Sequence, residues 1–470
     1  MNYFGLNPYL PLTEHVPDGE PRLFEDRVYI YGSHDRANGT SFCQEDYVTW
    51  SASIHDLTDW RYEGVIYRKE QDPLNPEGRL ALFAPDVVQG TDGKYYLYYC
   101  LQIQPVISVA ISDSPSGPFE FLDHVHRPDG RLLKEFMPYD PAVLVDDDGQ
   151  VFLYYGFSAV FISEKYGVPI SPGSMMVKLA PDMVTALTEP EPMIPWEGRA
   201  AGTEFEAHPF FEASSIRKIH GKYYLVYSSK WFRELCYAIS DHPDRGFHYG
   251  GVIVDNTDIG MNGRTEPACA TGTNHGGLVD LGDKVYIFYH RHTNGTSYSR
   301  QGCAEEVRIE ADGSIRQVEI TSCGLNGGPL PATGEWPAAI CCWLYGDFSP
   351  LFHKHMNEYN REEIACIAQD GDEVYIRNMM TNTTACFKYF RFDSPVNVTL
   401  WLRGRASGTV SLRLDEADSS PVASSGVSLF SDHWKTITLP VCMTGTHSLL
   451  VTYQGEGAVD FLKLVFTKIE

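Results

Sequence analysis

The sequence lacks long apolar runs and is poor in basic residues. No stretch reaches the roughly 18 apolar residues of a membrane-spanning helix, and the first residues show no basic segment followed by an apolar run. We therefore expect a cytoplasmic protein without a membrane partner. Lys and Arg number 37 against 62 Asp and Glu, and the formal net charge of −25 would repel nucleic acid and anionic polymers. This composition predicts a neutral partner and no nucleic-acid partner.

The cysteines lack the pattern of a disulfide framework or a zinc ribbon. There are 11 of them, an odd number, with Cys341 and Cys342 adjacent and no CxxC pair. We expect buried free thiols. The 470 residues exceed what one hydrophobic core normally organises, and the 43% of hydrophobic residues suffice for two domains.

One strand pattern occurs five times in the first two thirds of the chain, with almost no helical periodicity between the copies. The copies are DRVYIYGS (26–33), GKYYLYYC (93–100), GQVFLYYG (149–156), GKYYLVYS (221–228) and DKVYIFYH (283–290). They align Tyr29, Tyr96, Phe152, Tyr224 and Tyr286 in one column, spaced by 67, 56, 72 and 62 residues. Units of this length, built from short strands and Gly/Pro turns, predict an all-β fold with a five-bladed β-propeller.

An ionisable residue precedes each copy at a nearly constant distance. These residues are Asp18, Asp86, Asp140, Glu212 and His275, which lie 11, 10, 12, 12 and 11 positions before the aligned aromatic residues. Each taken alone fits ordinary turn chemistry. Because the innermost strand of every blade lines the central channel, five such groups at one depth predict a site on the propeller axis.

The segments around these residues resemble glycoside hydrolase family 43, the five-bladed propeller enzymes that act on arabinose- and xylose-containing glycans. The similar segments are PDGEPRLFEDRVYIYGSHD (17–35), YDPAVLVDDDGQVFLYYG (139–156), FFEASSIRKIHGKYYLVYS (210–228) and TNHGGLVDLGDKVYIFYH (273–290). The resemblance implies that Asp18 is the general base, Glu212 the general acid and Asp140 a modulator of the acid's pKa. It also implies that His275 lies at the channel centre and faces a calcium ion through water, and we expect no organic cofactor.

Two departures from the family pattern lie beside the carboxylates. Gly19 stands where many relatives have Pro after the base, and Ala213-Ser214 replace Gly-Pro after the acid. The three carboxylates themselves are all present. Inverting hydrolysis needs one ionised carboxylate to activate water and one protonated carboxylic acid to protonate the leaving oxygen, about 6.5–9.5 Å apart.

Four further residues are candidates for substrate binding. Asp86 occupies the second-blade position as a channel-lining hydrogen-bonding group, and Phe83 offers a ring for stacking on a sugar face. Arg300 corresponds to a late arginine of the family and presents a fork of donors to vicinal hydroxyls. His275 completes this set. An ordinary surface arginine explains Arg300 about as well, and the nearby His290-Arg291-His292 run stays unassigned.

The last part of the chain predicts a second domain. We expect the propeller to span 1–322, a turn-rich linker to span 323–337, and a jelly-roll-like β-sandwich to span 338–470, where seven short runs alternate at period two. Segments 410–422, 433–441 and 445–466 resemble a family 6 carbohydrate-binding module. Packing against the propeller is an equally good expectation for this domain, because a fold does not confer binding.

The predicted function is inverting hydrolysis that removes terminal β-D-xylosyl or α-L-arabinofuranosyl residues from oligosaccharides of plant hemicellulose. Two other functions compete with it. A retaining fructan or sucrose enzyme on the same fold would need an Asn-Asp-Pro-Asn-Gly nucleophile motif and a Glu-Cys-Pro acid motif, and neither is present. A catalytically silent glycan-binding propeller would lack one of the three carboxylates.

Overall fold

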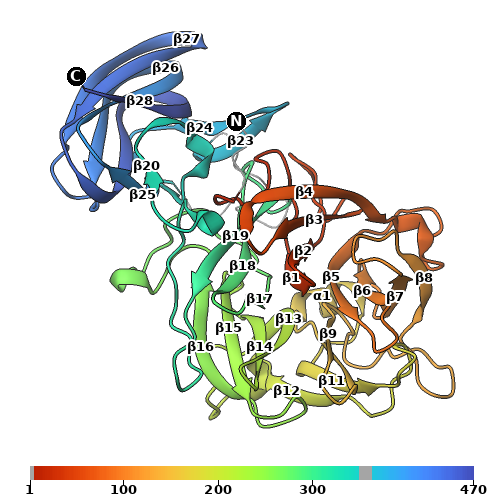
Figure 1. The fold of residues 1–470 in the computed structure, drawn as a ribbon. Helices are drawn as coiled ribbons and strands as arrows, with labels where there is room; N and C mark the ends of the chain where they lie inside the picture. The colour runs from red at the N-terminus through yellow and green to blue at the C-terminus, as the bar shows by residue number, and fades with distance from the viewer. Residues whose placement is uncertain (1–4, 349–362, 470) are drawn as a thin grey trace.

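The computed structural model describes residues 5–348 and 363–469, and it is almost entirely β-structure (Figure 1). Five separate sheets form the blades of a propeller, and a nine-stranded sheet forms a C-terminal domain beside it. The predicted all-β fold with a five-bladed propeller is confirmed. Among the described residues, no helix has the length and apolar character needed to cross a membrane.

Four blades have four antiparallel strands each. Blade 1 contains β1 (Glu20–Phe24), β2 (Arg27–Tyr31), β3 (Tyr47–Ser53) and β4 (Asp56–Tyr67). Blade 2 contains β5 (Leu82–Gln89), β6 (Tyr95–Leu101), β7 (Ile107–Ser112) and β8 (Glu120–His124). Blade 3 contains β9 (Ala142–Val145), β10 (Val151–Tyr155), β11 (Gly173–Leu179) and β12 (Glu191–Pro195). Blade 4 contains β13 (Phe210–Ile219), β14 (Lys222–Ser229), β15 (Glu234–Ser240) and β16 (His248–Asp255).

Blade 5 has three strands, and the N-terminal segment lies along its open edge. Its strands are β17 (Leu278–Asp280), β18 (Val285–His292) and β19 (Arg300–Val307). Tyr9 N–H donates to the carbonyl of Gly302 (3.2 Å), and the Asn7 side chain pairs with both backbone groups of Ala304. A bridge between Gly19 and Gly276 joins blade 1 to blade 5 on the channel side. The ring is therefore closed by the beginning of the chain.

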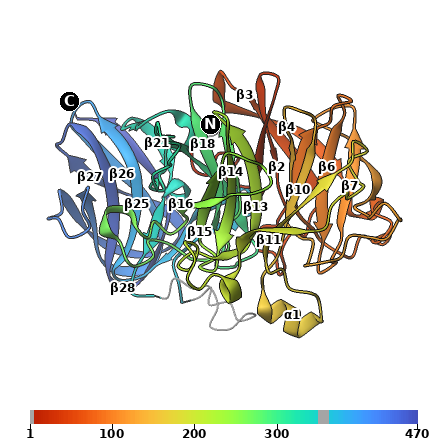
Figure 2. The same cartoon turned by 90° about the horizontal axis from the view of Figure 1, so that it is seen from below.

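The inner strands contact one another around a closed ring: β1, β5, β9, β13, β17 and back to β1. Figure 1 shows them gathered at the centre of the propeller, and Figure 2 shows α1 (Val160–Tyr166) projecting from one end of it. Because neighbouring strands of a blade are antiparallel, the loop after each second strand returns to the end where the inner strands begin. The five loops that follow β2, β6, β10, β14 and β18 therefore surround one mouth of the channel.

The repeated aromatic column has a packing role. Tyr29 packs in the core between blades 1 and 2, Tyr96 between blades 2 and 3, and Phe152 between blades 3 and 4. Tyr224 and Tyr286 continue this series and close it at blade 1. The residues between the aromatic ones, such as Val28 and Ile30, face the preceding blade. Both faces of these strands are buried, which is why they read as continuous apolar runs.

The C-terminal sheet differs from its prediction in strand number. It contains β20 (Leu330–Pro331), β21 (Gly334–Pro337), β22 (Trp343–Tyr345), β23 (Cys366–Asp370), β24 (Glu373–Met379), β25 (Thr383–Phe392), β26 (Val396–Leu414), β27 (Ala423–Val441) and β28 (Gly445–Lys468). Residues 323–337, predicted as a linker, thus contain two short strands that pair with β25 and β28. The likeness of this domain to a family 6 binding module stays a prediction.

Four of the seven predicted short strands join into two long ones. Runs 396–404 and 408–415 form β26, and runs 447–453 and 459–466 lie in β28. Gly408 and Gly455 lie opposite each other where a Cβ would come within 2.5 Å of the partner backbone. These glycines let two backbones approach while the strands bend, so they mark a curve and not a turn.

Candidate active site

The five ionisable residues lie at the mouth-side beginnings of the inner strands. Asp18, Asp140 and His275 precede β1, β9 and β17 by two or three residues, and Asp86 and Glu212 lie inside β5 and β13. Since those strands form one ring, the residues converge on the channel, as the sequence predicts. Local backbone strain marks the same places: Asp18, Asp140 and Ala213 have φ values of 55°, 48° and 67°. Positive φ outside glycine is costly and collects at functional sites.

Asp18 is buried beside a cation and a neutral histidine. Its Oδ1 accepts a hydrogen bond from Nη1 of Arg300 at 2.7 Å, and its backbone N–H donates to Nδ1 of His290 at 3.3 Å. Burial opposes ionisation, but the charge of Arg300 outweighs it and lowers the pKa of Asp18 to about 2. Asp18 is therefore ionised throughout the neutral range, as a general base must be.

Asp140 and Glu212 have the opposite behaviour. Burial and the charge of Asp18 raise the pKa of Asp140 to about 8, although the N–H of Ala213 donates to its Oδ2 at 3.1 Å. Burial, then Asp140 and Asp18, raise the pKa of Glu212 well above its usual value. Glu212 is the most exposed of the three carboxyl groups, which suits a proton donor that must reach a substrate. When one member of this pair ionises, its charge keeps the proton on the other.

The channel thus holds one carboxylate, Asp18, whose pKa is lowered, and two carboxyl groups, Asp140 and Glu212, whose raised pKa values favour the protonated form. This is the division of protons that acid and base catalysis by two carboxylates requires. The deciding feature is Arg300, because it contacts Asp18 directly, while no hydrogen bond or ion pair joins a cationic side chain to Glu212 among the residues described.

The family model of glycosyl hydrolases family 43 matches residues 20–315. The chain belongs to this family.

Several known proteins are similar to the chain. A xylosidase/arabinosidase of Thermoclostridium stercorarium is 46% identical over 97% of both chains. A xylosidase/arabinosidase of Bacteroides ovatus is 30% identical, with 97% of that protein aligned to 66% of this chain. Among solved structures, a family 43 β-xylosidase/α-arabinofuranosidase from a compost microbial metagenome, in complex with xylotriose and calcium-free, has a TM-score of 0.53 and 25% identity. That likeness covers 67% of this chain and 97% of that one.

Arg300 binds two aspartates in this family 43 channel. Its Nε and Nη2 donate to the two oxygens of Asp35 at 2.9 and 3.1 Å, while its Nη1 holds Asp18. The guanidinium is 4% exposed, and it stacks on the ring of Phe42 at 4.8 Å. The predicted contact with sugar hydroxyls stays a prediction, and the visible role of Arg300 is to hold the base ionised.

Two residues of this arrangement were missed in the sequence. His290 lies on β18 beneath Asp18, and its Nε2–H donates to the carbonyl of Thr273 at 2.8 Å, which leaves Nδ1 as the acceptor for Asp18. Burial and Arg300 lower the pKa of His290 well below its ordinary value, so it is neutral. Asp35 lies in the loop after β2. For His290, the sequence offered only the unassigned His290-Arg291-His292 run, which indicated no role. For Asp35, the sequence pattern gave no indication at all.

Asp86 requires a correction. Its side chain is fully buried, and both oxygens accept from the guanidinium of Arg22, with additional hydrogen bonds from the N–H groups of Val87 and Val143 at 2.8 Å. A carboxylate filled in this way offers nothing to a substrate. We reassign Asp86 to the packing of blades 1, 2 and 3, which its contacts join.

His275 lies between two buried carboxyl groups, those of Asp140 and Glu20. Its Nδ1 lies 3.9 Å from Oδ2 of Asp140, and its Nε2 lies 3.9 Å from Oε1 of Glu20. Burial lowers the pKa of His275 to about 4, so the ring is neutral. Oε2 of Glu20 accepts hydrogen bonds from Ser215 and Arg217, but its buried Oε1 has no hydrogen-bond partner among the residues that the structure describes. An unpartnered carboxylate oxygen facing a neutral imidazole fits a calcium ion and its waters.

Aromatic rings line the mouth from the first blade to the fourth. Phe83 lies between Phe42 and Tyr139, with ring centroids 6.5 and 5.7 Å away. The series continues through Phe157, Phe211 and Phe232 and ends on the other side at Tyr298, which contacts Phe42 edge-on at 4.6 Å. The ring of Phe83 is partly exposed, and its stacking on a sugar stays a prediction.

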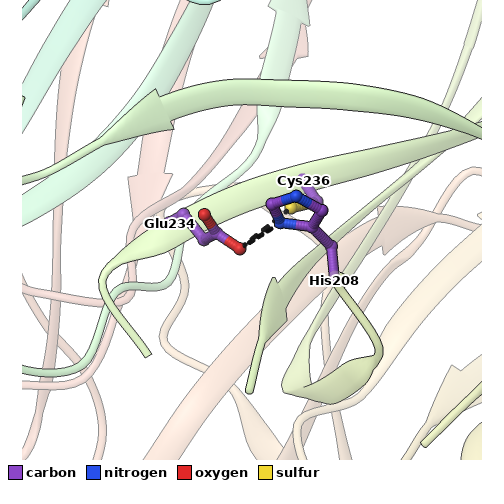
Figure 3. A group of neighbouring side chains, drawn as sticks. All are labelled: His208, Glu234 and Cys236. Atoms are coloured by element: carbon purple, nitrogen blue, oxygen red, sulfur yellow. Dashed lines mark hydrogen bonds and ion pairs between the residues drawn. The ribbon is translucent and has the colours of Figure 1, made fainter. Parts of the chain in front are cut away.

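A second group of potential ligands lies outside the channel, in blade 4 (Figure 3). The ligand atoms of His208, Glu234 and Cys236 lie within 4.8 Å of one another. Nδ1 of His208 lies 2.6 Å from Oε1 of Glu234, which also accepts from the Ser229 hydroxyl, and the imidazole stacks on Tyr249. Burial raises the pKa of the Cys236 thiol well above its usual value, which makes it a poor metal ligand. We assign the group to the hydrogen bonding of the blade.

Proposed function

We propose that this family 43 protein is an inverting glycoside hydrolase that removes terminal β-D-xylosyl or α-L-arabinofuranosyl residues from oligosaccharides of plant hemicellulose. The observation that carries the proposal is that Arg300 contacts Asp18 at 2.7 Å, while no hydrogen bond or ion pair joins a cationic side chain to Glu212 among the residues described. The pKa of Asp18 is accordingly lowered, and that of Glu212 is raised. The two xylosidase/arabinosidase relatives, at 46% and 30% identity, support the substrate class.

In the proposed reaction, a water molecule attacks the anomeric carbon while the glycosidic C–O bond breaks. Asp18 accepts a proton from the water, and Glu212 gives its proton to the departing oxygen. When Asp140 ionises, its negative charge raises the pKa of Glu212. Because the water attacks the face opposite the leaving group, the product has the inverted anomeric configuration.

The walls of the channel mouth support a neutral sugar substrate. Phe42, Phe83 and Phe232 of the aromatic series are at least partly exposed and offer rings to pyranose or furanose sugars, and the compost-metagenome relative binds xylotriose. The excess of acidic residues, which gives a net charge of −25, disfavours polymers that carry carboxylates.

A calcium ion near His275 is part of the proposal. Glu20 would bind it directly and His275 would bind it through water, and when bound it would supply positive charge in the channel. The calcium-free form of the related β-xylosidase/α-arabinofuranosidase supports calcium as the ion to test.

Hydrolysis of a panel of aryl β-xylosides, α-arabinofuranosides, β-galactosides and β-glucosides tests the substrate class. We expect turnover of the first two only. Proton NMR of the product, recorded before mutarotation, tests the stereochemistry, and we expect the inverted anomer first. Initial retention of configuration would refute the assignment of Asp18 as a base, because a retaining enzyme uses that carboxylate as a nucleophile.

The roles of the two catalytic carboxyl groups separate by leaving group. Glu212→Ala should lose far more activity on a xylo-oligosaccharide than on a dinitrophenyl glycoside, whose phenolate leaves without a proton. Asp18→Ala should lose about 10²–10⁴-fold on both substrates, because every substrate needs the activated water. Asp113→Ala, which removes an exposed carboxylate of blade 2, is the matched control. Rescue of Asp18→Ala by the better leaving group would reverse the two assignments.

A further inference from the structure

Strand β23 of the C-terminal domain lies against two loops at the mouth of the propeller channel (Figure 1). The N–H of Asn294 donates to the carbonyl of Ile367 at 2.6 Å, and the N–H of Gln369 donates to Oδ1 of Asn294 at 2.8 Å. Nδ2 of Asn38 donates to the carbonyl of Gln369 at 3.2 Å, and Nε2 of His15 lies 3.0 Å from Oε1 of Gln369. Propeller side chains thus capture the backbone of β23.

The same two loops carry the groups that hold the base. Loop 293–299 leads directly into Arg300, and loop 32–46 contains Asp35, which pairs with that guanidinium. The loops are also joined to each other, because the hydroxyl of Ser299 donates to the carbonyl of Arg36 at 3.1 Å. Phe42 of one loop and Tyr298 of the other make the edge-on contact at the mouth.

Asn294 and Asn38 are suited to this capture by their backbones. Their φ values are both 57°, in the left-handed region that Asn tolerates better than most residues. Asn294 is also 3% exposed, so its amide serves the protein interior and not solvent. Few residue types can occupy the position of Asn294, because it needs both a positive φ and a buried side-chain acceptor. This is what a dedicated joint between two domains requires.

We infer that β23 is a positioning element of the active site, which fixes the two mouth loops and through them the orientation of the Arg300 guanidinium toward Asp18. The C-terminal domain then contributes to the chemistry in the propeller as a fixed wall of the site and not as a separate glycan-capture module. The inference rests on the proposed hydrolase function. The Bacteroides ovatus relative aligns over 97% of its own length to 66% of this chain. About a third of this chain therefore has no counterpart in that relative, and this third is much longer than β23.

The test is the double variant Asn38→Gly/Asn294→Gly in the full chain. Glycine keeps the positive φ of both positions and removes only the side chains. We expect kcat on an aryl pentoside to fall about 10- to 100-fold while KM changes less than about 3-fold, because small misplacements of catalytic groups act on the chemical step. The single variant Asn294→Asp keeps the acceptor for the Gln369 N–H, so it should retain most of the kcat of the unmodified protein.

The control is Tyr389→Phe, which removes a 2.6 Å hydrogen bond to Glu319 at the same domain interface but away from the mouth. It should lower the melting temperature about as much as each glycine substitution and leave kcat unchanged. Hydrogen exchange of peptides covering 293–299 and 366–370 measures the contact between this loop and β23 without any substrate. In the double variant, both peptides should lose protection from exchange.

Unchanged kcat in the folded double variant, with protection lost, would overturn the inference and leave β23 a purely structural contact. A rise of KM on xylan alone would support separate glycan capture instead. If the unmodified protein hydrolyses no pentoside, the proposed function fails. Loss of hydrogen-exchange protection in both loop 293–299 and β23 of the double variant would still establish the contact between them.

Discussion

Removing the charge of Arg300 should move the acid limb of the pH profile. The pKa of Asp18 is about 2 with Arg300 at 2.7 Å, and without that cation it should return at least to its ordinary 3.8. At 1.36 kcal/mol per pKa unit, this change corresponds to about 2.4 kcal/mol of stabilisation of the ionised base. Burial of Asp18 pushes its pKa further upward.

The perturbation must also remove the partner charge. Arg300→Met alone would leave Asp35 buried without its cation, at a cost of roughly 3–5 kcal/mol in folding. The double variant Arg300→Met/Asp35→Asn removes both charges and keeps an acceptor oxygen for the N–H of Cys43. Asp35→Asn alone, which leaves Arg300 on Asp18, is the matched control. Near-ultraviolet circular dichroism and the melting temperature confirm folding of each variant.

The assay is kcat/KM on an aryl pentoside between pH 3.5 and pH 9, a range chosen to include the ordinary pKa of 3.8 for Asp18. The unmodified enzyme and Asp35→Asn should show no acid limb above about pH 4, whereas the double variant should lose activity below about pH 5. Linkage gives the same sign for stability. A depressed pKa stabilises the folded state above pH 3.8, and this contribution is lost as pH falls toward 2. An unmoved acid limb in the folded double variant would refute the assignment of Arg300.

Three further changes have defined outcomes. Asp140→Asn should shift the alkaline limb of the pH–rate profile to lower pH. It should also raise the melting temperature more at pH 8 than at pH 5, because a buried carboxyl group with its pKa raised to about 8 destabilises the fold as pH rises above 3.8. Calorimetry at both pH values measures the second effect. Asp86→Ala should cost roughly 3–5 kcal/mol in urea unfolding and leave KM unchanged, since it strands a buried cation, and a raised KM with normal stability would restore its sugar-binding role. Calcium should raise the melting temperature of the unmodified protein and not that of Glu20→Gln, and an equal rise in both would place the ion elsewhere.

The propeller was predictable because its packing repeats. Tyr29, Tyr96 and their equivalents each fill the gap to the next blade, so the same residue type returns at the same place in every unit. The polar residues before the strands share this register, which is why Asp18, Asp140 and Glu212 could be placed together from the sequence. The sequence and the structure agree on the positions of these three residues, while their catalytic roles stay predictions.

The partners of these residues could not be predicted in the same way. Arg22 lies 64 residues from Asp86, and nothing in either segment specifies a pair that forms only when blades 1 and 2 meet. Asp35 lies in a loop whose length differs from blade to blade, so it belongs to no column. In the C-terminal domain, the glycines of β26 and β28 look like turns in the sequence, and only the opposing backbone shows that Gly408 and Gly455 permit a close approach.

The position of one guanidinium decides which carboxyl group in the channel becomes the base. Asp18 and Asp140 are buried and Glu212 is partly buried, and the loss of hydration alone would raise all three pKa values. Of these three groups, Asp18 is the one that Arg300 contacts among the residues described, so that carboxylate ionises first, and its negative charge then favours the protonated form of the other two. The ionised base therefore helps to keep the acid protonated, because the charge of Asp18 raises the pKa of Glu212. The arrangement also makes the chemistry sensitive to whatever orients Arg300, and the residues that do so lie on loops held by a strand of the second domain.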